Sequence, residues 1–386
     1  MLVHICCSVD SHYFLSELTK IYPHESFVGF FYNPNIHPKS EHDLRLSDVK
    51  RSCDMLGIQL IEGEYDTENW FDGVRGLEKE PEKGNRCTQC FDIRLIKSAS
   101  IAKRLGEKKF TTTLLSSPMK EQKILYVQGD SIAQKEGLEF IKIDVRSNGG
   151  TQKQNELAKA DNLYRQNYCG CNFALEQQRN SQKRFSLEMM SHIGSQILPG
   201  SIEERRDIFS LRNELEKYNK EYILTQRKYM VWRLLSAKVE RGGNHMPSYI
   251  IAKSQNKKDA RTGPIFWIKP NIFENTSKFY NLEKQAFEYK NAPIHKYLIG
   301  YSKKDDSVFV HLDIFNMILN TSYKNIKELL YNPPKYDDEI FFRNFLCGDD
   351  SINPIIIIDE IYTESLRINI KSIFQEEIIF RVIENL

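Results

Sequence analysis

The sequence predicts an α/β protein, with a parallel sheet covered by helices on both faces in its N-terminal half, followed by an α+β C-terminal domain. Short apolar segments of strand length alternate with longer segments of helical periodicity through the first half, which is typical of a parallel sheet. The pattern then changes near residue 187. With 386 residues the chain exceeds one ordinary hydrophobic core, so we expect two or more domains.

The first half contains five expected strands, at residues 2–5, 27–32, 59–62, 110–115 and 140–145. Five helices are expected between and after them, at residues 11–21, 41–56, 90–105, 121–136 and 154–165. The second of these helices places Leu46, Val49 and Cys53 on one face. Ligands of such sheets bind outside the carboxyl ends of the strands, and Cys6-Cys7 follows the first strand at such an end.

The second half begins with a charged region, residues 201–241, that we expect to be helical, with helices at 211–220 and 222–239. Beyond Gly242-Gly243 the chain favours strands. These are expected at 248–252 and 265–268 around a basic loop at 253–261, in a hairpin of 297–301 and 308–312, and at 355–358. We therefore expect a metal-binding catalytic domain at 1–190 and an accessory α+β domain at 195–386.

The bulk composition excludes the extreme classes of protein. Charged residues make up 27% and hydrophobic ones 40%, which is ordinary for a soluble globular protein. The net charge of +2 does not by itself indicate a nucleic-acid-binding protein. No apolar run approaches the ~18 residues of a membrane span, and the N-terminus does not resemble a signal peptide. We expect a cytoplasmic protein, without a membrane partner, whose thiols stay reduced.

Cysteine spacing carries the strongest functional signal. Six of the eight cysteines form three close pairs, Cys6-Cys7, Cys87-x-x-Cys90 and Cys169-x-Cys171. Vicinal and C-x-C pairs would close strained disulfide rings, so the pairs instead favour ligation of an iron–sulfur centre or another soft metal. The C-x-x-C pair taken alone is compatible with zinc, iron–sulfur or a redox dithiol. Cys53 is expected in the core, and Cys347 is assigned no role.

The turn after the first strand has unusual chemistry. A strand-to-helix turn normally presents backbone N–H groups to an anion, but this one carries two thiols and the carboxylate of Asp10. A helix N-terminus lowers a thiol pKa, which favours metal binding, and Asp10 is placed to add an oxygen ligand. The alternative is a pair of small buried thiols with Asp10 as a helix cap.

Three further polar residues are candidate proton donors. Tyr32 ends the second strand, His37 follows it at the same edge of the sheet as Cys6-Cys7, and Asp144 lies at the end of the last strand. A histidine bonded to the backbone and a structural aspartate are the alternative interpretations. Glu41 and Arg45, one helical turn apart, are expected to be only an exposed pair.

Five motifs in order carry a family resemblance. They are Cys-Cys-x-x-Asp from Cys6, Tyr-Asn-Pro-Asn-Ile-His-Pro from Tyr32, Arg-Cys-x-x-Cys-Phe from Arg86, Phe-Thr-Thr-Thr-Leu-Leu-Ser-Ser-Pro from Phe110, and Tyr-Arg-Gln-x-Tyr-Cys-Gly-Cys from Tyr164. Over residues 1–175 the chain resembles the cobalamin-independent epoxyqueuosine reductase family. The family's domain is similar to the adenine-nucleotide hydrolase group of α/β folds. ATP-pyrophosphatase members of that group hold phosphates on a Ser-Gly-Gly-x-Asp-Ser loop. Residues 6–11 of this chain occupy that place and keep its Asp-Ser, but they replace its glycines.

The resemblance implies an enzyme that removes the epoxide oxygen of epoxyqueuosine at the tRNA wobble position, leaving queuosine. It further implies a [4Fe–4S] cluster and an additional iron ion. Carried onto this chain, the cluster ligands are Cys87, Cys90, Cys169 and Cys171. The ligands of the extra iron are Cys6, Cys7 and Asp10. The expected partners are tRNA carrying epoxyqueuosine and an external electron donor, with protons supplied by His37, Tyr32 or Asp144.

Two other functions compete with this one. An ATP-dependent tRNA sulfur-transfer enzyme of the same fold group shares the alternating pattern and paired cysteines, but would need a phosphate loop. A non-catalytic, metal-stabilised RNA-binding protein would hold zinc in closed thiolate sites. In the second domain, basic and aromatic residues alternate over 226–233, and lysines crowd the loop 253–261. These groups indicate either contacts to tRNA phosphates or an amphipathic helix with solvated lysines.

Overall fold

The computed structural model describes residues 1–190, 194, 196–268 and 299–384. By its internal contacts the chain divides into two compact units. The first comprises residues 1–190, 201–226 and 380–386, and the second residues 191–200 and 227–379. This division differs from the expected boundary near residue 195, because residues 201–226 and the C-terminal segment fall with the first unit.

The first unit is built on a parallel sheet of five strands in the order β3-β2-β1-β4-β5. The strands are β1 (Leu2–Ile5), β2 (Val28–Phe31), β3 (Gln59–Glu62), β4 (Lys109–Thr112) and β5 (Glu139–Phe140). The predicted parallel sheet is thus confirmed. Every residue of β1 is buried, as expected for a central strand covered on both faces. The last two strands are shorter than expected, because β4 passes into a 3₁₀ turn, η1 (Thr113–Leu115), and β5 has only two paired residues.

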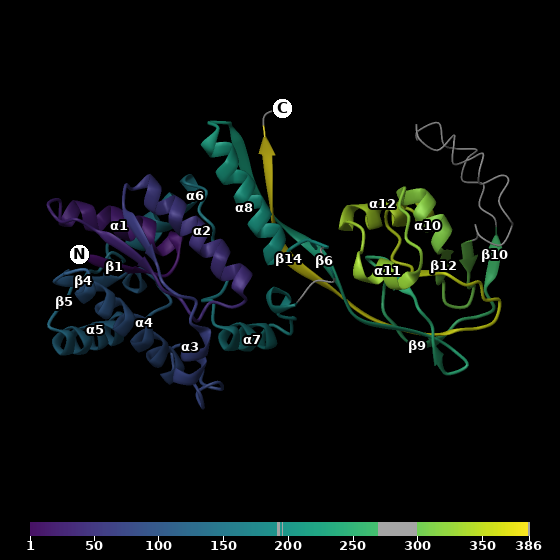
Figure 1. Cartoon of the computed structure of the whole chain (residues 1–386), viewed down its shortest axis with the longest axis horizontal. Coiled ribbons are helices and arrows are strands. Elements are labelled where there is room, and N and C mark those ends of the chain that lie inside the picture. Colours follow the sequence, from purple (N-terminus) through teal and green to yellow (C-terminus); the bar gives the residue numbers. More distant parts are fainter. Residues whose placement is uncertain (191–193, 195, 269–298, 385–386) are drawn as a thin grey trace. The chain divides into compact units, whose positions relative to one another are not determined.

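Helices cover both faces of this sheet (Figure 1). On one side lie α1 (Ser8–Ile21), α2 (Lys39–Met55) and α6 (Gly150–Ala160), of which α1 contacts both others. On the other lie α4 (Asn85–Arg104) and α5 (Gln122–Glu136), which contact each other, and α3 (Thr67–Gly73) packs on α4. The short helices α7 (Asn172–Ser181) and η2 (Leu187–Met189) follow. The apolar core lies between the sheet and these two helical layers.

The strand order places a topological switch point beside β1. From β1 the chain adds β2 and β3 on one side, and later adds β4 and β5 on the other. The connections that leave the carboxyl ends of β1 and β4 therefore run to helices on opposite faces of the sheet, α1 and α5, and open α/β sheets bind ligands in the crevice between such connections. Cys6 and Cys7 follow β1 directly, and η1 follows β4 at the same edge.

Helix α8 (Ile202–Lys217) packs on α2 within the first unit. Ser201 caps its N-terminus by accepting a hydrogen bond from the backbone N–H of Glu204 at 3.1 Å. One buried apolar cluster joins Leu44 of α2, Ile202 and Phe209 of α8, Phe380 near the C-terminus, and Tyr164 from the segment between α6 and α7. The first unit is therefore completed by residues far along the sequence.

The predicted helix at 222–239 is wrong. These residues lie in a strand of 20 residues, β6 (Tyr222–Arg241), that neighbours a strand of 18 residues, β14 (Arg367–Glu384). Aromatic and β-branched residues such as Tyr222, Val231 and Trp232 favour a strand once a partner strand supplies the backbone hydrogen bonds. That partner lies more than a hundred residues away in the sequence, where local periodicity carries no information about it.

The second unit contains two sheets and three described helices. One sheet has the order β10-β11-β12-β13-β8 and the other β7-β6-β14-β9. Their remaining strands are β7 (Asn244–His245), β8 (Tyr249–Ile250), β9 (Lys257–Arg261), β10 (Phe266–Ile268), β11 (Ile299–Tyr301), β12 (Val308–His311) and β13 (Ile355–Ile358). The helices are α10 (Leu312–Leu319), α11 (Ile326–Tyr331) and α12 (Tyr336–Cys347).

Predictions for this half are confirmed in part. The hairpin is present as antiparallel β11 and β12, although residues 297 and 298 of its first strand lie outside the described residues. The apolar run at 355–358 is the fully buried strand β13. The basic segment expected as a loop contains β9, which pairs with β14. Among the described residues, no helix is both long and apolar enough to cross a membrane.

Candidate metal centre

The first group of candidate ligands surrounds the start of α1. Cys7 is the N-cap residue of this helix and Asp10 lies in its first turn. The Sγ atoms of Cys6 and Cys7 are 3.8 Å apart, and Cys6 Sγ lies 3.4 Å from Asp10 Oδ2. The three ligand atoms all lie within 4.8 Å of one another. Two thiols and a carboxylate at this spacing can bind one metal ion.

Hydrogen bonds from other strands and helices hold these side chains. Thr113 Oγ1 accepts from the backbone N–H of Cys6 at 3.1 Å and lies 3.3 Å from its Sγ. Gln154 Nε2 donates to Asp10 Oδ1 at 2.8 Å, and Ser116 Oγ donates to Gln154 Oε1 at 2.6 Å. Metal ligands in proteins are commonly oriented by such outer partners.

The second pair, Cys87 and Cys90, lies in the first turns of α4, which begins at Asn85. A spacing of three residues places both thiols on one face of the helix. The preceding loop is held by the buried Arg86, whose Nη1 donates to the carbonyl oxygens of Glu78 at 2.7 Å and Glu80 at 2.5 Å. The helix start is therefore rigidly placed against its own loop.

The third pair, Cys169 and Cys171, lies in a tight loop before α7. Gly170 between them has a φ of +105°, and a Cβ there would approach Ile36 Cγ1 to 2.8 Å. Arg45 donates to the carbonyl oxygens of Tyr168 at 3.0 Å and Cys169 at 3.2 Å. Glycine is thus required by both conformation and space, and Arg45 fixes the loop.

Arg45 and Glu41 correct an expectation. They do not form an exposed pair, because their side chains are only 3% and 0% exposed. Glu41 Oε1 accepts from Arg45 Nε at 2.7 Å, and Tyr164 Oη donates to Glu41 Oε2 at 2.9 Å. A buried ion pair that holds the Cys169 loop was not visible in the sequence, because an i,i+4 spacing says nothing about what covers the helix.

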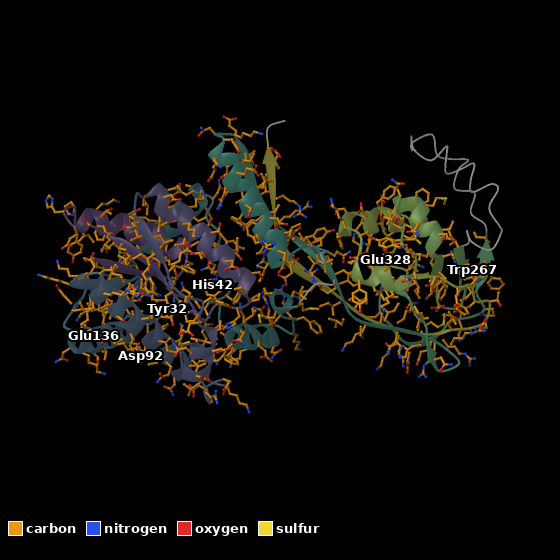
Figure 2. The ribbon with its side chains drawn as sticks, in the orientation of Figure 1. Tyr32, His42, Asp92, Glu136, Trp267 and Glu328 are labelled. Carbon is orange, nitrogen blue, oxygen red and sulfur yellow. The ribbon has the colours of Figure 1, made fainter. Side chains whose placement is uncertain are left out.

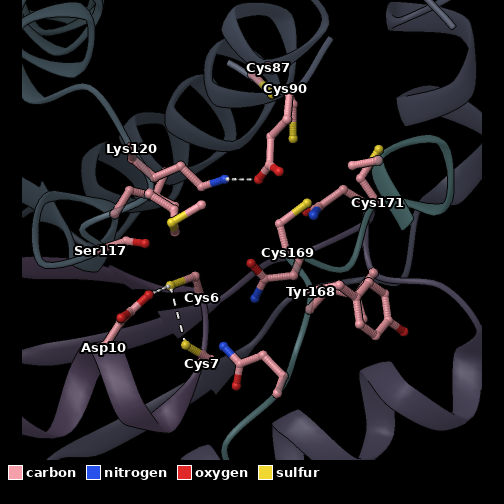
Figure 3. Close-up of a pocket in the computed structure, with 18 of the residues that line it drawn as sticks. Cys6, Cys7, Asp10, Cys87, Cys90, Ser117, Lys120, Tyr168, Cys169 and Cys171 are labelled. Atoms are coloured by element: carbon pink, nitrogen blue, oxygen red, sulfur yellow. Dashed lines mark hydrogen bonds and ion pairs between the residues drawn. The ribbon is translucent and has the colours of Figure 1, made fainter. Parts of the chain in front are cut away.

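All six paired cysteines line one cavity of about 340 Å³, together with Asp10 (Figure 3). Cys6 and Cys7 enter it from the end of β1, while Cys87 with Cys90 and Cys169 with Cys171 enter from two other segments. Folding therefore gathers thiols from three parts of the chain around one space. The predicted ligands are brought together as a group.

Among the described residues that line the cavity, Lys120 is the one lysine, and its ammonium group faces these thiols. Lys120 lines the cavity, its side chain is 10% exposed, and its Nζ lies 3.8 Å from Glu82 Oε1. Burial lowers the pKa of Lys120, but the neighbouring Cys169 and Cys87 outweigh this and raise it overall. Lys120 thus supplies positive charge where several thiolates would otherwise repel one another.

The thiols themselves differ in acidity. The hydrogen bond with Cys171, aided by the charge of Lys120, lowers the pKa of Cys169 well below its usual value. The same hydrogen bond and burial raise the pKa of Cys171. At the first site, the hydrogen bond with Cys6 and burial raise the pKa of Cys7, and burial raises the pKa of Asp10. Burial also raises the pKa of Cys87.

The three predicted proton donors lie elsewhere. Among the described residues that line the cavity, none is His37, Tyr32 or Asp144. His37 packs against the rings of Trp70 and Phe71, and burial lowers its pKa. Tyr32, labelled in Figure 2, is 1% exposed. Asp144 is exposed, and hydrogen bonds from Ser147 and Gln122 lower its pKa to about 2.

Sequence reasoning missed several residues of the site. Lys120, Gln154, Ser116 and Thr113 had no assigned role, although Thr113 and Ser116 belong to a motif that carried the resemblance. One sequence feature could have identified them: each lies in the part of the chain that follows the carboxyl end of β4 or β5, where ligands of such sheets bind. Of the other two cysteines, Cys53 lies in the core as expected. It is fully buried, and burial raises its pKa to about 12. Cys347 is half-buried at the end of α12.

The fold and the cavity together define an α/β protein with a thiol-rich site at its switch point. The family model for "Epoxyqueuosine reductase QueH" matches residues 1–177. A protein of that name from Helicobacter pylori is 42% identical over 389 residues, which cover 98% of this chain and 99% of that one. The chain belongs to the epoxyqueuosine reductase QueH family.

Other similar proteins are shorter. The Thermotoga maritima protein of the same name is 34% identical over 189 residues, 48% of this chain but 95% of its own. The Histophilus somni protein is 37% identical over 179 residues, 45% of this chain and 72% of its own. A solved structure, the U34-tRNA thiolase NcsA from Methanococcus maripaludis with its [4Fe-4S] cluster, is 15% identical over 47% of this chain and 66% of that one, with a TM-score of 0.32. That similarity is too low to establish a common fold.

Proposed function

We propose that this chain, an epoxyqueuosine reductase by family, carries out the reduction in the cavity lined by its six paired cysteines. In this proposal Cys87, Cys90, Cys169 and Cys171 hold a [4Fe–4S] cluster, and Cys6, Cys7 and Asp10 hold an additional iron ion. The observation that carries it is the convergence of six thiols and one carboxylate on a single space. The substrate is tRNA carrying epoxyqueuosine at the wobble position, so we place the reaction in the cytoplasm.

The donor atoms fit these groups. Thiolates are the usual ligands of iron–sulfur clusters, and four are available from a helix start and a glycine-bent loop. The compact ion site formed by Cys6, Cys7 and Asp10 is separate from these four thiols. That compact site has three ligands, which leaves room for another ligand on a bound ion.

The reaction requires two electrons and two protons, because an epoxide plus these yields an alkene and water. The two metal groups would supply the electrons, received from an external donor, and Lewis acidity toward the epoxide oxygen. The chain's own residues bind the modified base, hold the ligands in place and deliver protons. Lys120 Nζ holds a proton inside the cavity, so we propose it as a proton donor. His37, Tyr32 and Asp144 stay predictions in that role, and their positions lend it no support.

The α/β unit is, in this proposal, of the adenine-nucleotide hydrolase type, with metal ligands where nucleotide-binding members hold phosphates. The turn after β1 supports it, because Cys7 and Ser8 stand where the phosphate loop has the two glycines that a close phosphate contact needs.

Cysteine substitution tests the proposal. Replacing any one of Cys6, Cys7, Cys87, Cys90, Cys169 or Cys171 by Ser is expected to lower bound iron or abolish turnover. Cys53→Ser and Cys347→Ser are matched controls, because these thiols lie outside the cavity, and they should retain both properties. Iron, sulfide and zinc analysis of anaerobically purified protein, with a visible spectrum, provides the measurement. A colourless zinc protein, or loss of the cluster in Cys53→Ser but not in Cys169→Ser, would contradict the proposal.

A further inference from the structure

Three segments meet at the compact ion site through one chain of hydrogen bonds. Ser116 follows η1, Gln154 lies in α6 and Asp10 lies in α1. Ser116 Oγ donates to Gln154 Oε1 at 2.6 Å, and Gln154 Nε2 donates to Asp10 Oδ1 at 2.8 Å. Ser116 is fully buried and Gln154 is 4% exposed, so little water competes for these contacts.

The order of donors and acceptors in this chain of hydrogen bonds fixes the orientation of the Gln154 amide. Because the Ser116 hydroxyl occupies the amide oxygen, the NH₂ group of Gln154 is the end that faces Asp10. The amide therefore favours an ionised Asp10, which only accepts hydrogen bonds. Among the described residues that line the cavity, Gln154 is the one whose amide donates to Asp10, while the thiol of Cys6 donates to the other carboxylate oxygen at 3.4 Å.

The two oxygens of Asp10 are thereby made unequal. Oδ1 is taken by Gln154, whereas Oδ2 lies 3.4 Å from Cys6 Sγ on the side of the thiols. Cys6 is itself fixed, because its N–H and its Sγ both contact Thr113 Oγ1. We propose that Gln154 is a positioning residue that makes Asp10 bind a metal ion through Oδ2 alone. This inference rests on the proposed metal site at Cys6, Cys7 and Asp10.

One-oxygen binding has a chemical consequence. A carboxylate that used both oxygens would occupy two coordination positions on the ion. Asp10 restrained by Gln154 occupies one, so two thiolates and one oxygen leave a position open for an exogenous oxygen ligand. Loss of the restraint also lets Asp10 rotate away from the thiols, which weakens the site before any ion arrives.

Metal affinity measures this role without recourse to turnover. The full-length, cluster-loaded chain is treated with a chelator that removes loosely held metal, and Co²⁺ is then titrated anaerobically while thiolate-to-cobalt absorbance is recorded. Gln154→Leu, which keeps the side-chain size but removes the amide, should raise the Kd for Co²⁺ by about 10–100-fold. The cluster spectrum should not change. Gln128→Leu is the matched control, because Gln128 also donates to a carboxylate, Asp92 at 2.7 Å, but does not line the cavity.

A double-variant cycle separates positioning from a general structural effect. In an Asp10→Ala background there is no carboxylate for Gln154 to orient. Adding Gln154→Leu should therefore cause no further loss of Co²⁺ affinity. Equal losses in both backgrounds would overturn the inference, as would an unchanged Kd in Gln154→Leu. A wild-type chain that fails to bind Co²⁺ at all would instead overturn the proposed metal site.

A second variant keeps the test decisive if Gln154→Leu does not fold. Ser116→Ala leaves Gln154 in place but frees its amide to turn, so a smaller rise in Kd is expected, with the melting temperature followed in parallel. A Ser116→Ala protein that binds Co²⁺ as tightly as the wild type, and loses no affinity on further change of Gln154 to Asn, would contradict the proposed role.

Discussion

Lys120 is the residue whose surroundings most favour a direct part in the chemistry. Its ammonium group is almost enclosed, faces the thiols of Cys87 and Cys169, and contacts only one carboxylate within the described lining, that of Glu82. A cation in this place has two possible effects, because it neutralises thiolate charge and it holds a proton.

Two substitutions of Lys120 distinguish these effects. Lys120→Gln is expected to lower kcat by about 10²–10⁴-fold while iron content is retained, because a general acid typically contributes that much. Lys120→Arg keeps the charge, but guanidinium does not release a proton, so its kcat should stay low. Single-turnover kinetics with iron analysis measure both. Near-normal turnover in Lys120→Arg would show that charge alone is needed.

His4 makes the stability of the first unit depend on pH. The ring is fully buried, with Nδ1 2.8 Å from Thr112 Oγ1 and Nε2 3.1 Å from the carbonyl oxygen of Tyr32. Burial and the charge of Arg94 lower its pKa well below the ordinary value. Burial also lowers the pKa values of His12, His37 and His42.

The sign of this dependence follows from proton binding. Below about pH 6.5 the unfolded chain binds protons that the folded chain does not, so the free energy of unfolding should fall as the pH falls. Each such histidine adds a slope of up to about 1.4 kcal/mol per pH unit. His4→Gln should therefore show a shallower slope than the wild type in urea titrations between pH 7.5 and 5. The exposed His24 is the control, and an identical slope in His4→Gln would refute this account.

At the scale of elements, the attachment of α8 to α2 depends on a buried ion pair. Arg212 Nη2 donates to Asp48 Oδ1 at 2.7 Å, and the two side chains are 0% and 1% exposed. Asp48 also accepts from the backbone N–H of Tyr164 at 2.8 Å and from the hydroxyl of Ser8 beside the ion site. One carboxylate thus joins α8, the segment before Cys169 and the start of α1.

Removing one member of this pair should be costly. Arg212→Met leaves the Asp48 charge buried without its partner, which is expected to lower the free energy of unfolding by about 3–5 kcal/mol. Urea denaturation followed by circular dichroism measures this. Arg75→Met is the matched control, because Arg75 pairs with Asp72 on the surface, and it should change stability little. A cost for Arg212→Met no larger than that of the control would contradict the argument.

The whole molecule combines the unit that contains the cysteine-lined cavity with an additional unit. Every residue that lines the cavity falls within residues 6–178, which belong to the first unit. The Thermotoga maritima relative matches under half of this chain over nearly its whole length, while the Helicobacter pylori relative matches almost all of it. The metal chemistry is therefore expected to reside in the first unit alone.

Two shortened chains test this expectation. A fragment ending at residue 190 lacks α8 and residues 380–386, so it exposes Leu44 and Tyr164 and leaves Asp48 unpaired. We expect it to be unstable. A chain with residues 227–379 replaced by a short linker retains these contacts, since Thr225 Oγ1 lies 3.3 Å from the Arg381 carbonyl, and should fold and bind iron. Iron content and melting temperature compare them, and a stable, iron-loaded 1–190 fragment would show that α8 is dispensable.

The parallel sheet was predictable from the sequence, and so was the group of six cysteines and Asp10 that lines the cavity. Apolar strands and periodic helices alternate at local spacings, and cysteines separated by zero, one or two residues carry their meaning within the motif. These signals depend only on residues that are close together in the sequence, so the sequence alone is enough to recognise them. The position of Cys6-Cys7 at a strand end, and hence at a binding edge, follows from the same local pattern.

Only the tertiary structure decided the surroundings of those ligands. The contact of Gln154 with Asp10, the contacts of Arg45 with the Cys169 loop and the place of Lys120 among the thiols join residues that lie 30 to 144 positions apart. The strand β6 was mistaken for a helix, because its hydrogen-bonding partner β14 lies far along the chain. The three proton-donor candidates stay predictions, although none of them lines the cavity. Following a strand places a residue near an edge of the sheet, but packing decides whether its side chain faces the cavity or the core.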